Sequence, residues 1–189
     1  MGKLLVVFPG VGYHCDKPLL YYGRKLAAEQ GYEECRSLSY AAPVDKIRGN
    51  REKMEKAFEA LYAQTVEQLQ DVDWNEYDDI LFISKSIGTI IATAYAKENK
   101  IKNVRQVLYT PLEDTFKVMS LEFGSDAVAF IGTADPWSHV ARVIELAKEH
   151  GVAIHVYENV NHSLEGSDTI ANLEIMRDVM AKTKEFFEV

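Results

Sequence analysis

Short apolar runs alternate along this chain with longer segments in which apolar residues recur at helical spacing. The runs predict strands with the sequences KLLVVF (3–8), YEECRSLSY (32–40), DDILFIS (78–84), VRQVLYT (104–110), DAVAFIG (126–132) and AIHVYEN (153–159). Runs that are apolar almost throughout are typical of parallel strands buried on both faces. We therefore predict an α/β fold, with a doubly wound, mostly parallel six-stranded sheet in the order 2-1-3-4-5-6, helices on both faces, and a single domain over residues 1–189.

The helical stripe between the second and third strands is the clearest. Apolar residues there recur at i, i+3, i+4 and i+7 from Met54 to Leu69, as on one face of an amphipathic helix. Further stripes run over residues 19–27, 87–95, 140–147 and 173–183. Gly31 and Gly151 follow two of these stripes, where a helix commonly ends in a left-handed residue. The stretch AAPVDKIRGN (41–50) is the one place with room for a lid, and such a lid would be small.

Composition argues against some classes of function but does not identify one. The chain has 29 acidic and 21 basic residues, a net charge of -8 and a pI near 5.2, so its surface should repel nucleic acids and anionic membranes. The cysteines, Cys15 and Cys35, have no C-x-x-C spacing, and the N-terminus shows no signal peptide. We expect a cytoplasmic protein that binds neither nucleic acid nor membrane, and the sequence leaves a homodimer open.

The strongest chemical signal is the segment Ser84-Lys85-Ser86-Ile87-Gly88, in which an apolar strand runs directly into an amphipathic helix. It resembles the G-x-S-x-G nucleophile elbow of α/β-hydrolases, with Ser84 in place of the first glycine. Small residues are needed on both sides of the nucleophile because the backbones pass closely in this turn. Ser86 would also stand at a helix N-terminus, where free N–H groups favour negative charge. The segment predicts Ser86 as the nucleophile.

Two backbone N–H groups are candidates for an oxyanion hole. Ile87 follows the nucleophile, and Val11 lies in the glycine-rich turn FPGVGYH after the first strand. In the predicted strand order, the loops after strands 1 and 3 open side by side at the topological switch point. Both N–H groups could therefore face one substrate carbonyl. A dinucleotide site or P-loop fits less well, because the third fingerprint glycine is missing and no G-K-[ST] follows.

A serine nucleophile needs a base and a residue that orients the base. His162 follows the last strand in YENVNHSLEG, and we predict it as the general base. Asp135 follows the strand before that histidine in FIGTADPW, so it completes the chain order Ser, Asp, His. Glu113 or Asp114, after the fourth strand, is the alternative acid.

Other residues near strand ends are candidates for the substrate pocket. They are Gly12, Tyr13, Cys15, Tyr109, Leu112 and Trp137. Cys15 lacks the elbow position that would lower its pKa, so we expect it to line the pocket or to pack rather than to react. No His, Cys or Asp cluster has the spacing of metal ligands, and we expect neither a metal nor another cofactor.

The motifs PGVG, SKSIGT, GTADPW and NHS, in this order and spacing, resemble a compact α/β-hydrolase of the dienelactone-hydrolase and esterase type. The resemblance spans nearly the whole chain and implies a minimal α/β-hydrolase fold and a serine hydrolase. Dienelactone hydrolases use a cysteine nucleophile, so only the reaction type carries over. The expected partner is a small ester, with a thioester or amide left open.

Three other interpretations of the same residues remain open. The chain could be a binding protein that holds a ligand in the cleft of this fold without turnover. It could be a flavodoxin-like module in which GVG and SKSIGT cradle a nucleotide phosphate. It could also be a degenerate hydrolase whose elbow is distorted by Ser84 or Lys85.

Overall fold

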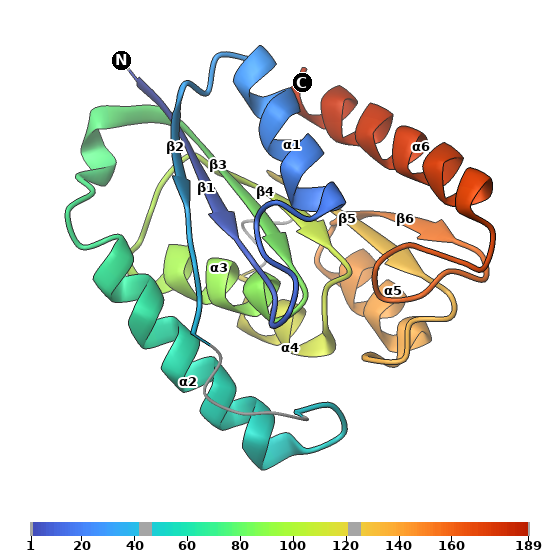
Figure 1. The fold of residues 1–189 in the computed structure, drawn as a ribbon. Coiled ribbons are helices and arrows are strands. Elements are labelled where there is room, and N and C mark those ends of the chain that lie inside the picture. Colours follow the sequence, from blue (N-terminus) through green and yellow to red (C-terminus); the bar gives the residue numbers. More distant parts are fainter. Residues whose placement is uncertain (1, 42–46, 121–125, 189) are drawn as a thin grey trace.

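The computed structural model describes residues 2–41, 47–120 and 126–188 and contains one parallel sheet of six strands (Figure 1). The strands are β1 (Gly2–Phe8), β2 (Glu34–Ser37), β3 (Tyr77–Lys85), β4 (Val104–Tyr109), β5 (Ala127–Gly132) and β6 (Ala153–Tyr157). They are ordered β2-β1-β3-β4-β5-β6, and every neighbouring pair is parallel. The predicted fold class and strand order are confirmed. The lid segment 41–50 lies partly outside the described residues, since 42–46 are not among them.

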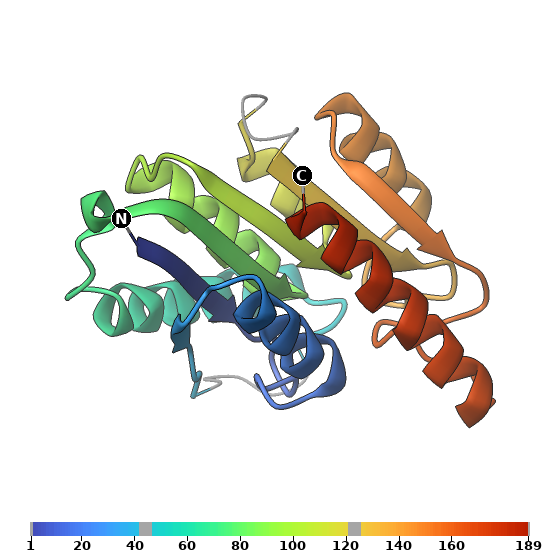
Figure 2. The same cartoon turned by 90° about the horizontal axis from the view of Figure 1, so that it is seen from above.

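Helices cover both faces of the sheet (Figure 2). They are α1 (Pro18–Glu29), α2 (Arg51–Gln68), α3 (Ile87–Glu98), α4 (Glu113–Val118), α5 (Val140–Glu149) and α6 (Thr169–Phe187), with a 3-10 turn η1 (Trp74–Glu76). α1 and α6 pack together on one face, and α2, α3, α4 and α5 form a row on the other. The sequence pattern did not reveal α4, because a helix of 6 residues is too short to show an amphipathic stripe.

The interior strand β1, which lies between β2 and β3, shows why its sequence is apolar throughout. Leu4, Val6 and Phe8 pack in the core under α2 and α3, whereas Leu5 and Val7 pack in the core under α1 and α6. Successive side chains point to opposite faces of a strand, and here both faces are covered. All five side chains have no exposed surface. A strand with two buried faces cannot show the polar alternation of a half-exposed one.

The sequence pattern predicted the ends of two helices better than it predicted the length of the second strand. Gly31 and Gly151 have φ values of 88° and 71°, so both adopt the left-handed conformation expected after a helix. The second strand, predicted over 32–40, is shorter, since β2 pairs with β1 only from Glu34 to Ser37. One further backbone bond joins Leu38 N to Val7 O at 3.0 Å, close to where β1 itself ends at Phe8. An edge strand cannot extend past its only neighbour.

Parallel pairing places the carboxyl ends of all strands at one edge of the sheet. Because β1 pairs with both β2 and β3, the topological switch point lies between the loops that follow β1 and β3. The loops after β5 and β6 open at the same edge. Within the described part of the chain, no helix combines the length and apolar character needed to span a membrane.

Candidate active site

Ser86 occupies a strained turn between β3 and α3. Its φ is 58° and its ψ is -127°, a conformation that residues other than glycine rarely adopt. Backbone bonds hold the turn: Ser86 N donates to Tyr109 O at 3.1 Å, and Thr89 N donates to Ser86 O at 2.9 Å. Such a conformation costs on the order of 1–3 kcal/mol and persists where the surroundings impose it, often at functional sites.

The neighbours of Ser86 fit tightly against the backbone. A Cβ atom on Gly88 would lie 2.5 Å from Pro9 O and 2.6 Å from Phe8 O, so no larger residue fits there without a shift. Ser84 stands where the family pattern has glycine, and its buried hydroxyl donates to Val107 O at 3.1 Å. The hydroxyl is therefore satisfied, and Ser84 does not disturb the elbow.

Three side chains from loops after β3, β5 and β6 form a chain of hydrogen bonds. Nε2 of His162 lies 2.7 Å from Oγ of Ser86, and Nδ1 of His162 lies 2.6 Å from Oδ2 of Asp135. The other carboxylate oxygen of Asp135 accepts the Trp137 N–H at 2.8 Å. The structure thus brings together the three residues predicted as nucleophile, base and acid, although they are far apart in the sequence.

The surroundings of His162 favour the neutral imidazole. Burial lowers the pKa of His162, and the positive charge of Lys85 lowers it further, while the hydrogen bond to Asp135 acts in the opposite direction. The carboxylate of Asp135 can only accept, so it selects the tautomer with a proton on Nδ1 and a free lone pair on Nε2. The ring of Trp137 stacks on the imidazole, with centroids 5.4 Å apart. His162 is thus held ready to accept the Ser86 proton.

The loop that carries His162 approaches β5 very closely. A Cβ atom on Gly132 would lie 2.2 Å from Val160 O, and Ala134 N donates to that same carbonyl at 3.0 Å. Thr133 N donates to Tyr157 O at 2.8 Å. Gly132 therefore sets the distance between the acid loop and the histidine loop. Sequence reasoning missed this role, although Gly132 is the first residue of the GTADPW segment that carries Asp135.

The turn after β1 packs against the elbow. Gly10 and Tyr13 exchange two backbone hydrogen bonds, at 3.1 and 3.2 Å, and Gly12 adopts a φ of 71°. A Cβ atom on Gly10 would lie 3.2 Å from both Lys85 O and Ser86 Cβ. This tight turn places Val11 at the wall of the cavity above Ser86.

That cavity has a volume of about 190 Å³. It is lined by Val11, Gly12, Tyr13, Ile47, Met54, Lys85, Ser86, Ile87, Trp137, His162 and Ser163. Ile47, which precedes α2, and Met54, which lies in its first turns, were not predicted, because nothing in their local pattern distinguishes them from core residues. Lys85 and Ser163 were also missed, although each adjoins a predicted catalytic residue.

Two predicted pocket residues lie elsewhere, so these expectations need correction. Tyr109 is fully buried in the core under α1 and α6, where its hydroxyl lies 2.9 Å from Thr183 Oγ1. Leu112 is buried in the core on the opposite face of the sheet. Tyr109 ends β4 and Leu112 follows it, as expected. Their side chains, however, point into the packed layers rather than into the described cavity.

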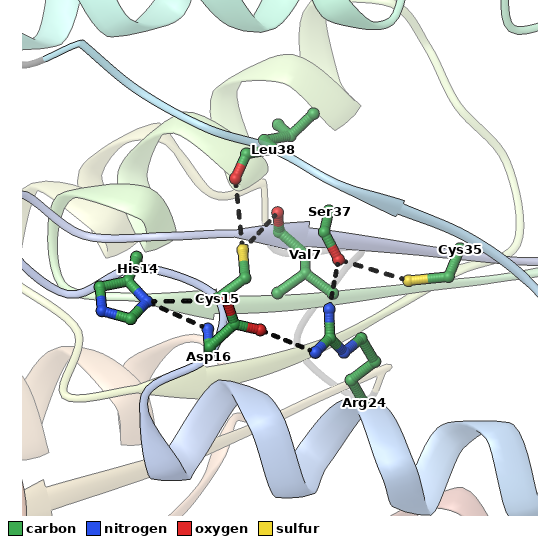
Figure 3. A network of polar contacts seen from close by, with 8 residues as sticks. All are labelled: Val7, His14, Cys15, Asp16, Arg24, Cys35, Ser37 and Leu38. Carbon is green, nitrogen blue, oxygen red and sulfur yellow. Dashed lines mark hydrogen bonds and ion pairs between the residues drawn. The ribbon is translucent and has the colours of Figure 1, made fainter.

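Cys15 does not line the described cavity either. Its polar contacts lie with the ends of β1 and β2 (Figure 3). Its thiol is buried and points toward two backbone carbonyls, with Sγ 3.3 Å from Leu38 O and 3.9 Å from Val7 O. Burial raises the pKa of Cys15 to about 12. Cys15 is therefore a packing residue that holds the turn after β1 against β2.

The alternative acids have other partners. Glu113 Oε1 accepts the His139 N–H at 2.7 Å, and Asp114 Oδ1 lies 2.6 Å from Lys117 Nζ. Asp135 is the carboxylate that contacts His162. Among residues 2–41, 47–120 and 126–188, no group of three or more His, Cys, Asp and Glu side chains is arranged to hold a metal ion.

Comparisons with known proteins add information on the fold. No family model matches the sequence, and a search of curated proteins finds no match. Solved structures match over nearly the whole chain. A protein of the α/β-hydrolase superfamily from Xanthomonas campestris pv. campestris is similar with a TM-score of 0.62 and 12% identity, covering 98% of this chain and 99% of its own.

Two further similar structures have names that state an enzymatic activity. An α/β serine hydrolase homologue from Coxiella burnetii has a TM-score of 0.60 and 15% identity, with 96% of this chain and 84% of that chain covered. An esterase from Pyrococcus furiosus has a TM-score of 0.61 and 14% identity, with 98% and 82% covered. This chain has the α/β-hydrolase fold, as the sequence motifs predicted.

Proposed function

We propose that this chain is a serine hydrolase that cleaves a small carboxylic ester through an acyl-enzyme on Ser86. The observation that carries the proposal is the continuous hydrogen-bond chain from Ser86 through His162 to Asp135. It begins at a strained elbow and borders a cavity at the carboxyl edge of the sheet. A packing role alone would require neither the strained φ of Ser86 nor a buried carboxylate aimed at an imidazole.

The geometry supports a two-step reaction. His162 Nε2 takes the proton from Ser86 Oγ as that oxygen attacks the ester carbonyl, which gives a tetrahedral oxyanion. The imidazolium then donates its proton to the departing alcohol oxygen, and the acyl group remains on Ser86. Water, deprotonated by the same histidine, attacks the acyl-enzyme and releases the carboxylic acid. Asp135 keeps the imidazole oriented and stabilises its positive charge in both steps.

The oxyanion would be stabilised by backbone donors. We assign this role to the N–H groups of Ile87 and Val11, both of which belong to residues lining the cavity. Ile87 is the first residue of α3, so its N–H has no carbonyl one turn earlier in the helix and the helix dipole adds to the attraction. Donors fixed in this way need no rearrangement as the charge develops.

The cavity supports a small ester as the substrate. At about 190 Å³ it has room for a short acyl or alcohol group, with Trp137, Ile87 and Met54 as apolar walls. The similarity to an esterase fits this choice. Thioesters would use the same chemistry, whereas amides demand a better-positioned leaving group. Because the three side chains supply the nucleophile and both proton transfers, the reaction needs no metal or other cofactor.

Both cysteines are free thiols, Cys15 buried and Cys35 exposed, which supports a reducing, cytoplasmic location. A small-molecule ester remains the expected partner, with no role for nucleic acid or membrane.

The direct test is hydrolysis of p-nitrophenyl acetate and butyrate by the wild type, Ser86→Ala and His162→Ala. We expect each variant to lose at least about 10³-fold in kcat/KM, since either change removes a member of the nucleophile-base pair. Ser39→Ala is the matched control, because it removes the hydroxyl of an exposed residue that follows β2. If the folded wild type hydrolyses neither ester, or if Ser86→Ala hydrolyses them equally well, the proposal is wrong.

A further inference from the structure

Lys85 is an unusual residue for the position next to a nucleophile. Its side chain is almost completely buried, with 1% of the residue's surface exposed, and it lines the cavity together with Ser86 and His162. Lysine is among the residues least often buried without a partner. Its place at the wall of the cavity means that a bound molecule could reach its ammonium group.

Within the described residues, the Lys85 ammonium has neither a hydrogen bond nor an ion pair. Nζ lies over the ring of Tyr13, 4.9 Å from its centroid, which is a cation–π contact. The carboxylate of Asp135 attracts it, but the two oxygens of this group already accept from His162 and Trp137. The fixed surroundings of Lys85 therefore leave its hydrogen-bond donors unused.

This arrangement makes the charged form of Lys85 costly. Burial lowers the pKa of Lys85 to about 7, despite the attraction of Asp135. An anion in the cavity would supply the missing partner, raise that pKa again and restore the full positive charge. His162 and Tyr13 are ionisable residues that line the same cavity. Burial lowers the pKa of His162 and raises that of Tyr13 to about 12, so both favour a neutral form that does not compete for an anion.

We propose that Lys85 binds a carboxylate carried by the substrate, so that the site prefers half-esters of short dicarboxylic acids over neutral esters. This inference rests on the proposed esterase function for the reaction, but the anion site itself does not require turnover. A carboxylate suits the site because the cavity is small, at about 190 Å³, and offers a single ammonium. The half-ester would place its ester carbonyl at Ser86 and its free carboxylate at Lys85.

Turnover of a matched substrate pair tests this preference. Monomethyl succinate and methyl butyrate differ in a terminal carboxylate against a methyl group, and proton release follows their hydrolysis. We expect the wild type to favour monomethyl succinate by tenfold or more in kcat/KM. Lys85→Met, which keeps the length of the side chain, should reduce that ratio by roughly tenfold to a hundredfold, the range of a charge-assisted hydrogen bond. A lysine with only a packing role would lower both rates and leave the ratio unchanged.

Lys102→Met is the control for loss of one positive charge, because Lys102 is exposed in the turn before β4, at the opposite edge of the sheet. Its substrate ratio should equal that of the wild type. An equal fall of the ratio in Lys102→Met and Lys85→Met would overturn the proposal, since the effect would then come from net charge.

Binding without turnover separates this inference from the proposed function. Titration calorimetry should detect succinate binding to Ser86→Ala and a loss of at least tenfold in affinity in Ser86→Ala/Lys85→Met. That result would support the anion site even if no ester were hydrolysed. Equal affinity in the two variants, or no binding to Ser86→Ala, would overturn the anion site while leaving ester hydrolysis by the wild type standing.

Discussion

Oγ of Ser86 and Nε2 of His162 lie 2.7 Å apart, although 76 positions separate the two residues in the sequence. Parallel pairing of β1, β3, β4, β5 and β6 brings the loops that carry them to one edge of the sheet. The distance is that of an O–H···N hydrogen bond, so the Ser86 hydroxyl can donate directly to Nε2 of the tautomer that Asp135 selects. The proposed reaction would therefore start from a positioned base rather than from one that must be recruited.

The acid limb of the pH–rate profile should lie below the usual histidine range. Burial lowers the pKa of His162, so the imidazole becomes neutral, and able to accept a proton, at a pH below the ordinary value of 6.5. The kcat/KM for a neutral ester should rise with pH through this lower region and then level off. Ester hydrolysis measured between pH 4.5 and 8 checks this, and an acid limb centred above 6.5 would contradict it.

Asp135→Asn should reduce kcat by about 10⁴-fold while leaving the fold intact, because the amide can donate to Nδ1 and select the wrong imidazole tautomer. Thermal unfolding should show a Tm close to that of the wild type. Glu113→Gln serves as the control, since Glu113 contacts His139 and not His162. If Glu113→Gln proved the more damaging change, the assignment of the acid would be wrong.

Gly132→Ala should destabilise the protein by more than about 2 kcal/mol, because the added methyl group would sit 2.2 Å from Val160 O. The backbone must then separate the β5 and β6 loops, which also pulls Asp135 and His162 apart. Gly166→Ala is a matched control, since its nearest new contact would be at an ordinary 3.5 Å. Urea unfolding of the two variants measures the difference, and equal midpoints would refute the claimed close approach.

Stability should rise with pH above neutrality on account of Lys85. Burial lowers its pKa from 10.5 to about 7, so between these values the unfolded chain holds a proton that the folded chain has released. The unfolded state binds more protons there, and the free energy of unfolding therefore increases with pH. Urea unfolding at pH 7 and pH 9 should show a larger gain for the wild type than for Lys85→Met. If the free energy of unfolding rose equally in both proteins between pH 7 and pH 9, the pH dependence would not come from Lys85.

The fold could be predicted from the sequence because its two periodicities are strong. β1, β3 and β5 read as apolar runs, and the long helix α2 shows a regular stripe. The ends of β2 could not be read, since they depend on where the neighbouring strand β1 stops. The short helix α4 offered too few residues for a period to show.

The candidate site was predictable to the extent that its residues follow strand ends. The proximity of Ser86, Asp135 and His162 could be predicted because each sits in a loop whose position the topology fixes. Tyr109 and Leu112 follow the same rule, but side-chain direction at a strand end depends on packing that no sequence pattern shows. The sequence did not predict Lys85 as a pocket residue, because its burial at the cavity wall is a property of the folded structure.

The most direct test of the central claim is covalent labelling with a fluorophosphonate, which reacts with serines that an adjacent base has activated. Peptide mapping of the labelled wild type should place the phosphonate on Ser86, and labelling should vanish in Ser86→Ala and slow strongly in His162→Ala. A folded wild type that stays unlabelled, or a label that maps to another residue, would contradict the assignment of Ser86 as the nucleophile.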